Sequence, residues 1–126
     1  MVFGKVNGKD VICMQGRFHL YEGYAADACA FPIRVMKLFG VERLVLTNAA
    51  GGLNQSYKLG DFMIIKDHLN IPALCGLSPL VGKNDPQWGP RFPNMHNCYD
   101  NELRKIGLEG KHKLWNALPV ECVSNT

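Results

Sequence analysis

The pattern of hydrophobic and polar positions predicts two β-prone runs joined by a tight turn at the start of the chain. Residues 2–6 and 10–14 flank Asn7-Gly8, and an Asn-Gly pair accepts the positive φ angles of a hairpin turn. The second run contains Val11-Ile12-Cys13-Met14, which is apolar at every position, as in a strand that is buried on both faces. We therefore expect a hairpin whose second strand is buried.

Helical spacing follows over residues 25–38, where apolar side chains recur every three or four positions. Pro32 lies within this stretch and predicts a kink, or a late start of the helix near Phe31. Gly40 is a suitable C-terminal stop. A further helix is expected over residues 99–106.

Two more apolar runs, residues 43–47 and 62–65, predict strands. The order strand, helix, strand predicts a parallel βαβ unit with a right-handed crossover. Residues 71–97 carry five prolines and little periodicity, which is typical of a functional or interfacial loop. The chain is therefore expected to adopt an α/β fold with a central mixed or parallel sheet and a βαβ crossover.

Composition and charge narrow the class of protein. A length of 126 residues with 47% hydrophobic residues suits one compact domain. The net charge is +3 with scattered Lys and Arg, which predicts no nucleic-acid partner. The five cysteines show no CxxC spacing, which favours reduced thiols in a cytoplasmic protein over disulfides or a metal site. No signal peptide and no apolar run of membrane-spanning length are found, so we expect no membrane association.

Candidate chemistry lies first in residues 15–24. Arg17 offers a planar fork of donors suited to phosphate, and His19 can donate a further hydrogen bond. In an extended loop Arg17, His19 and Tyr21 would point the same way. The plainer interpretation is a solvated loop with one surface arginine and one structural histidine.

A second candidate is the run Asn48-Ala49-Ala50-Gly51-Gly52, whose small residues could present backbone N–H groups to an anion. The alternative is a tight turn that only needs positive φ. Because this run and Arg17 both follow predicted parallel strands, the topology would bring them to one crevice. Phe92 could cover a bound sugar, pack at a subunit interface or anchor its own loop. His68 is interpreted as structural.

These segments, taken together, resemble the trimeric purine nucleoside phosphorylase family, and the resemblance covers roughly residues 2–105. The motifs are long and colinear, and such motifs are far more specific than a lone short pattern. They are Met14-Gln15-Gly16-Arg17-Phe18-His19-Leu20-Tyr21-Glu22-Gly23-Tyr24, Phe31-Pro32-Ile33-Arg34-Val35, Leu46-Thr47-Asn48-Ala49-Ala50-Gly51-Gly52-Leu53-Asn54, Gly60-Asp61, Asp67-His68-Leu69-Asn70, Asn84-Asp85, Arg91-Phe92-Pro93 and Tyr99-Asp100.

The resemblance implies phosphorolysis of inosine- and guanosine-type nucleosides to the purine base and ribose 1-phosphate. It also implies a homotrimeric enzyme that acts in purine salvage. Such an enzyme uses inorganic phosphate as a co-substrate and no metal or organic cofactor. By the same resemblance, the phosphate ligands are Arg17, His19 and the backbone N–H of Ala49, the ribose contacts are Tyr21 and Phe92, and the supporting residues are Glu22 and Asn48.

The resemblance also implies a nucleoside phosphorylase fold that is truncated at both ends, because family members are more than twice as long. We expect a partial family domain over residues 1–106 and a tail over 107–126 that does not resemble the family and could be disordered. The alternative function is an inactive truncation that only associates with full-length subunits. Methylthioadenosine phosphorylase, a related enzyme, fits the loop motifs less well. Without the family's purine-binding residues, the chain alone is expected to release no hypoxanthine from inosine.

Overall fold

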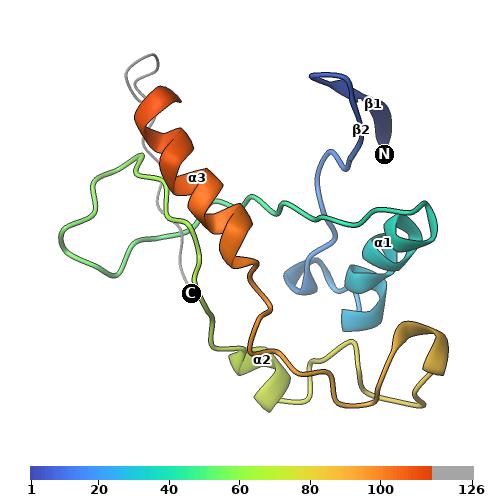
Figure 1. Ribbon diagram of the computed structural model, residues 1–126. Coiled ribbons are helices and arrows are strands. Elements are labelled where there is room, and N and C mark those ends of the chain that lie inside the picture. Colours follow the sequence, from blue (N-terminus) through green and yellow to red (C-terminus); the bar gives the residue numbers. More distant parts are fainter. Residues whose placement is uncertain (115–126) are drawn as a thin grey trace. The chain divides into compact units, whose positions relative to one another are not determined.

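The computed structural model describes residues 1–114 (Figure 1). These residues form two compact units. The first unit contains residues 1–45 and 71–91, and the second contains residues 46–70 and those from Phe92 onward. The chain therefore passes from one unit to the other after residues 45, 70 and 91. This division matters for function because the candidate site residues fall into both units.

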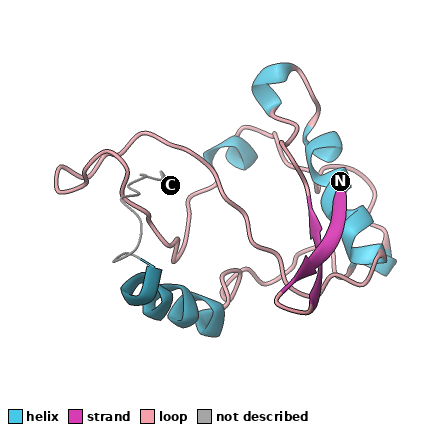
Figure 2. Cartoon of the chain, turned by 90° about the horizontal axis from the view of Figure 1, so that it is seen from above, coloured by secondary structure: helices cyan, strands magenta, loops and turns pink. Residues whose placement is uncertain are grey.

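The first unit begins with the predicted hairpin, formed by β1 (Val2–Val6) and β2 (Lys9–Cys13), drawn in magenta in Figure 2. The strands are antiparallel, with a register that ends at Val6↔Lys9. Asn7 and Gly8 form the two-residue turn with φ angles of 48° and 76°, as the Asn-Gly signal predicts. The expected burial of the second strand is wrong, since four of its five residues are exposed. Among the described residues these two strands pair only with each other, and a two-stranded sheet buries little apolar surface by itself.

The predicted helix is confirmed as α1 (Ala26–Leu38). Pro32 lies inside it, and the late start near Phe31 does not occur because the helix begins five residues earlier. Pro32 and Met36 are its buried residues, and Met36 is only 5% exposed. One face of α1 therefore supplies the small apolar core of this unit.

Gly40 ends α1 as predicted. Its φ angle is 85°, and its N–H donates to the carbonyl of Lys37 at 3.0 Å. The N–H of Val41 donates to the carbonyl of Met36 at 3.1 Å, which completes a Schellman cap. Phe39, next to this cap, meets Phe3 of the hairpin edge to face, with ring centres 5.5 Å apart. The hairpin thus packs on the C-terminal end of α1.

The long loop of the first unit contains two short helices, α2 (Ile71–Leu74) and η2 (Pro86–Trp88). The carboxylate of Asp85 accepts a backbone N–H from the first turn of η2 at 3.1 Å. The guanidinium of Arg34, in α1, lies 5.8 Å from the centre of the Trp88 ring, which is within the range of a cation–π contact. Residues of the loop are therefore tied to the helix rather than left without tertiary contact.

The second unit contains α3 (Asn101–Leu114). Asp100 caps it by accepting the N–H of Leu103 at 2.8 Å. A helix was expected over residues 99–106, and α3 extends beyond that range through Gly107. A Cβ atom added at Gly107 would lie 2.9 Å from Cδ1 of Ile64, so this glycine permits a close approach between α3 and the segment that contains Ile64. The domain boundary at residue 106 stays a prediction, and residues 115–126 of the expected tail lie outside the described residues.

The strands expected over residues 43–47 and 62–65 are not formed in the described part of the chain, and neither is the βαβ crossover that needs them. Both segments are irregular. Residues 43–47 are all exposed, Val45 by 81%, whereas residues 62–65 alternate between exposed and half-buried positions, with Phe62 60% exposed. The apolar pattern identified segments suited to burial, but a strand also needs neighbours for its N–H and C=O groups. The mixture of helices with a short sheet agrees with the α/β class.

Candidate functional site

The loop that carries Arg17 and His19 runs between two glycines with left-handed backbone. Gly16 has a φ angle of 78°, and Gly23 has one of 91°. His19 is extended, with φ −124° and ψ 148°, and the chain then turns through the short helix η1 (Leu20–Glu22). The loop is therefore extended up to His19 and tightly turned after it.

One carboxylate oxygen of Glu22 holds both the backbone and the ring of His19. Glu22 Oε2 accepts the N–H of His19 at 2.8 Å and lies 3.0 Å from His19 Nδ1. A carboxylate can only accept, so this contact assigns a proton to Nδ1 and leaves Nε2 for another partner. The hydrogen bond from the His19 side chain, and then that from its backbone, lowers the pKa of Glu22 below 4.5. Glu22 is therefore ionised at neutral pH.

Tyr21 covers one face of the same imidazole. The rings of His19 and Tyr21 are stacked, with centres 4.8 Å apart and planes 23° apart. We expected Arg17, His19 and Tyr21 to share one side of an extended loop. The extended stretch instead ends at His19, and the turn of η1 brings Tyr21 back onto it. The structure thus brings together His19, Tyr21 and Glu22.

Arg17 stands two residues before His19 and is exposed. The base of this loop is held by Phe18 and Tyr24, whose rings meet edge to face with centres 4.9 Å apart. The guanidinium of Arg17 is therefore carried on a loop with its own packed support. A planar cation and an imidazole separated by one residue suit an oxyanion with several acceptor oxygens.

The other predicted site residues belong to the second unit. Asn48 and Ala49 lie in irregular chain that leads to a turn at Asn54, whose Oδ1 accepts the N–H of Ser56 at 3.0 Å. Phe92 is 87% exposed. The crevice that would join these residues to Arg17 and His19 stays a prediction.

A tertiary pair in the second unit was missed by sequence reasoning. The hydroxyl of Tyr99 lies 2.9 Å from Nδ1 of His68, and the two rings meet edge to face, with centres 5.6 Å apart. Burial raises the pKa of Tyr99 above 10, with smaller contributions from the charges of Cys98 and Asp67. His68 was interpreted as structural, and this contact is a structural one. No local signal could have found it, because the partners are 31 residues apart.

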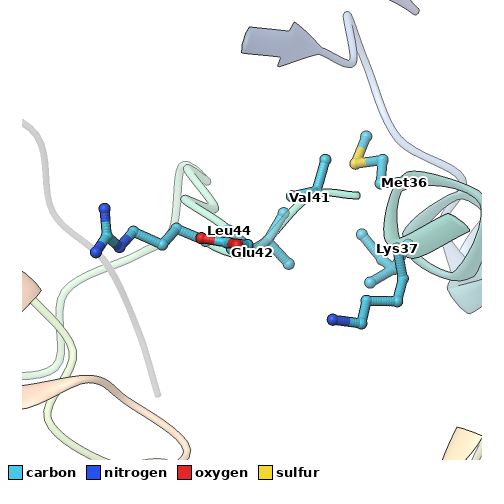
Figure 3. A pocket seen from close by; sticks show the side chains of 7 residues that line it. Met36, Lys37, Val41, Glu42 and Leu44 are labelled. Carbon is cyan, nitrogen blue, oxygen red and sulfur yellow. The ribbon is translucent and has the colours of Figure 1, made fainter. Parts of the chain in front are cut away.

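Other features add no further site. A hollow of about 90 Å³ lies beside the C-terminal half of α1, and Figure 3 shows Met36, Lys37 and Val41 along it. None of the predicted site residues lines this hollow. In the described part of the chain, leaving out the side chains of residues 111–114, no three His, Cys, Asp or Glu side chains gather as metal ligands do. No helix in that part of the chain is long and apolar enough to span a membrane.

Three known proteins show the similarity in detail. The mouse purine nucleoside phosphorylase is 53% identical over 105 residues, which are 83% of this chain and 36% of the mouse protein. A crystal structure of Schistosoma purine nucleoside phosphorylase in complex with hypoxanthine superposes with a TM-score of 0.85 at 53% identity, covering 88% of this chain and 40% of that one. Isoform 2 from Schistosoma mansoni, in complex with cytosine and ribose-1-phosphate, gives 0.84 at 48% identity and covers 88% and 39% of the two chains.

The chain thus spans about two fifths of the length of these relatives. The resemblance inferred from the loop motifs is confirmed, and so is the partial nucleoside phosphorylase fold. The family described as the phosphorylase superfamily matches residues 1–122. This chain is a member of the phosphorylase superfamily, and its similarity is to purine nucleoside phosphorylases.

Proposed function

We propose that the chain takes part in the phosphorolysis of purine nucleosides. In this reaction a phosphate oxygen forms a bond to C1′ of the ribose while the bond from C1′ to the purine breaks, which gives the free base and ribose 1-phosphate. The observation that carries the proposal is the His19 imidazole, which contacts Glu22, stacks on Tyr21 and lies two residues after Arg17. The hypoxanthine and ribose-1-phosphate complexes of the similar proteins support this choice of substrates.

Arg17, His19 and the backbone N–H of Ala49 are the proposed phosphate ligands. Arg17 supplies a permanent charge and a fork of donors. His19 would turn its Nε2 to the phosphate, because Glu22 already occupies Nδ1. Asn48 would shape the turn that presents Ala49. The site then surrounds the anion with donors from two loops.

Tyr21 and Phe92 are the proposed ribose contacts. Tyr21 stacks on His19, a proposed phosphate ligand, and a ribose contact must lie close to the phosphate because the two substrates react with each other. Phe92 is almost fully exposed, which suits a side chain that reaches into the site of a neighbouring subunit. We therefore include a homotrimer in the proposal, with the site completed across the subunit contact.

The chemistry favours this arrangement. Breaking the bond to the purine leaves positive charge on the ribose, and an anionic phosphate held beneath C1′ both stabilises that charge and supplies the nucleophile. We propose that phosphate is a co-substrate and that the reaction uses no metal or organic cofactor. A setting in cytoplasmic purine salvage is part of the same proposal, supported by the free thiols of Cys13, Cys29, Cys75 and Cys98.

A second candidate is an association module that joins full-length subunits without catalysing the reaction. The exposed apolar segments around Val45 and Phe62 favour it, since such segments are suited to burial against another polypeptide. In this case the chain would co-purify with a full-length purine nucleoside phosphorylase subunit, and Phe92→Ala would weaken that association. No co-purification at micromolar concentration would count against it.

Phosphate binding tests the proposed site directly. Arg17→Ala is expected to weaken binding of inorganic phosphate to the chain by roughly tenfold or more, because a charge-assisted hydrogen bond is lost. Arg43→Ala removes an equal charge from another exposed position and should change binding less than about twofold. Equal effects of the two substitutions would mean that Arg17 acts only through net charge.

Turnover is a separate measurement. The chain alone is expected to release no hypoxanthine from inosine and phosphate, because the residues identified here hold phosphate and ribose but not the purine. Release of hypoxanthine that Arg17→Ala abolishes would establish that the chain carries a working minimal site and would contradict this expectation. Adding a full-length subunit to the same assay shows whether activity appears only in the assembly.

A further inference from the structure

We infer that Tyr21 is a positioning residue for His19, whose imidazole plane it fixes so that Nε2 faces the phosphate. The inference rests on the proposed function, in which His19 is a phosphate ligand. Tyr21 would then have two roles, the proposed ribose contact and the positioning of His19, and the second depends on the aromatic ring rather than on the hydroxyl.

The two neighbours of His19 constrain different motions of the ring. The contact of 3.0 Å between His19 Nδ1 and Glu22 Oε2 fixes one point on the edge of the imidazole. Together with the covalent bond to Cβ, this hydrogen bond restrains the ring, but it still tolerates tilting of the ring plane because hydrogen bonds accept a range of angles. The stack with Tyr21, at 4.8 Å and 23°, removes this freedom because turning the plane would break the contact between faces. Only Nε2 and the opposite face then remain for a ligand.

The exposure of both side chains supports a local role. Tyr21 is 84% exposed, so its ring is not an anchor of the core. The side chain of His19 is 37% exposed, which leaves it accessible to a small anion. The turn of η1 directs Tyr21 onto His19, and Gly23, with a φ angle of 91°, ends that turn. The backbone of the loop is thus shaped to make this stack.

Removing the aromatic ring separates the two roles of Tyr21. Tyr21→Leu should weaken phosphate binding roughly two- to fivefold, the order of effect that one aromatic contact has. Tyr21→Phe keeps the ring and loses only the hydroxyl, so it should bind phosphate as the unmodified chain does. A residue that acted only through its hydroxyl would give the opposite order.

The experiment is a phosphate titration of the 126-residue chain followed by NMR of the His19 ring. In the unmodified chain and in Tyr21→Phe, the His19 ring protons should carry the upfield shift of a stacked aromatic neighbour, and phosphate should move the Nε2 signal. In Tyr21→Leu the upfield shift should vanish and the phosphate affinity should fall. His19 ring shifts in Tyr21→Leu that equal those of Tyr21→Phe would overturn the inference.

Two further arms keep the outcomes distinct. If Tyr21→Leu loses the signals of the Phe3–Phe39 contact, it has unfolded the first unit, and Tyr21→Thr is then compared with Tyr21→Phe in its place. If phosphate leaves the unmodified chain unchanged while the His19 ring shift still depends on the Tyr21 ring, the stack is supported and the proposed phosphate site is refuted. Phosphate binding of equal affinity in all variants supports the site and refutes the positioning role.

Discussion

Replacing Tyr99 by Phe would remove the hydrogen bond to His68 and leave the aromatic contact in place. The hydroxyl oxygen lies 2.9 Å from Nδ1 of His68, and the rings meet at 87°. The bond joins two stretches that are 31 residues apart in the sequence, and within the second of them the N–H of Cys98 donates to the carbonyl of Met95 at 3.1 Å. Its loss should therefore loosen both stretches together.

The expected size follows from the surroundings of the pair. A typical intramolecular hydrogen bond contributes about 0.5–1.5 kcal/mol, and the larger costs arise when a deeply buried partner is left unsatisfied. His68 and Tyr99 are only half-buried, so water can replace the hydroxyl at His68. We expect about 1 kcal/mol, which is roughly a fivefold increase in local opening.

Amide hydrogen exchange measures this opening. In Tyr99→Phe, residues 66–70 and 95–100 should exchange roughly fivefold faster, while β1 and β2 in the first unit should not change. Tyr57→Phe is the matched control, because the Tyr57 hydroxyl makes a weaker contact of 3.6 Å with the sulfur of Met63. Unchanged exchange in Tyr99→Phe, or an equal change in Tyr57→Phe, would refute the reasoning.

Three further predictions test local features. The pKa of Glu22 is lowered in the folded chain, so its contribution to loop order is present above pH 4.5 and is lost as the pH falls through the folded-state pKa. Glu22→Gln should abolish this acid transition in the NMR signals of His19. An unchanged transition in the variant would contradict the assignment to Glu22. Gly107→Ala should stabilise α3 by less than the ~1 kcal/mol expected at an open helix position, because the new Cβ atom would lie close to Cδ1 of Ile64. Ile64→Val removes that Cδ1 atom, so in its presence Gly107→Ala should give the full stabilisation. Additive effects of the two substitutions in circular dichroism would show that the two residues are not in contact. Gly8→Ala should destabilise the hairpin by roughly 1–2 kcal/mol through its φ of 76° alone, since nothing lies within 4 Å of the new methyl group; cross-strand NMR contacts that persist unchanged to higher urea would argue against strain.

The elements that the sequence predicted correctly are those whose causes are local. Asn7-Gly8 determines the hairpin turn, and Gly40 ends α1, because both act through backbone angles that few other residues adopt. Residues 43–47 and 62–65 were predicted as strands from side-chain pattern, which records what they are suited to contact. Whether a strand forms depends also on neighbours, and these are not encoded in the segment itself.

The same distinction applies to the site. The loop of Arg17 and His19 could be predicted as a unit because its residues are consecutive. The geometry within it could not, since alternation of side chains was assumed where η1 turns the chain. The length of α3 could not be predicted either, since the helix was expected over residues 99–106. Gly107 lies inside α3, where its lack of a Cβ atom permits the close approach of Ile64.

The exposed segments around Val45 and Phe62 would also differ from the hairpin and the helices in the time that they need to form regular structure. A hairpin or a helix forms within microseconds from its own residues, at a rate that dilution does not change. If a second polypeptide supplies the missing neighbours, pairing along these segments becomes a bimolecular step whose rate rises with protein concentration. The concentration of such a partner would then decide how soon these segments become strands.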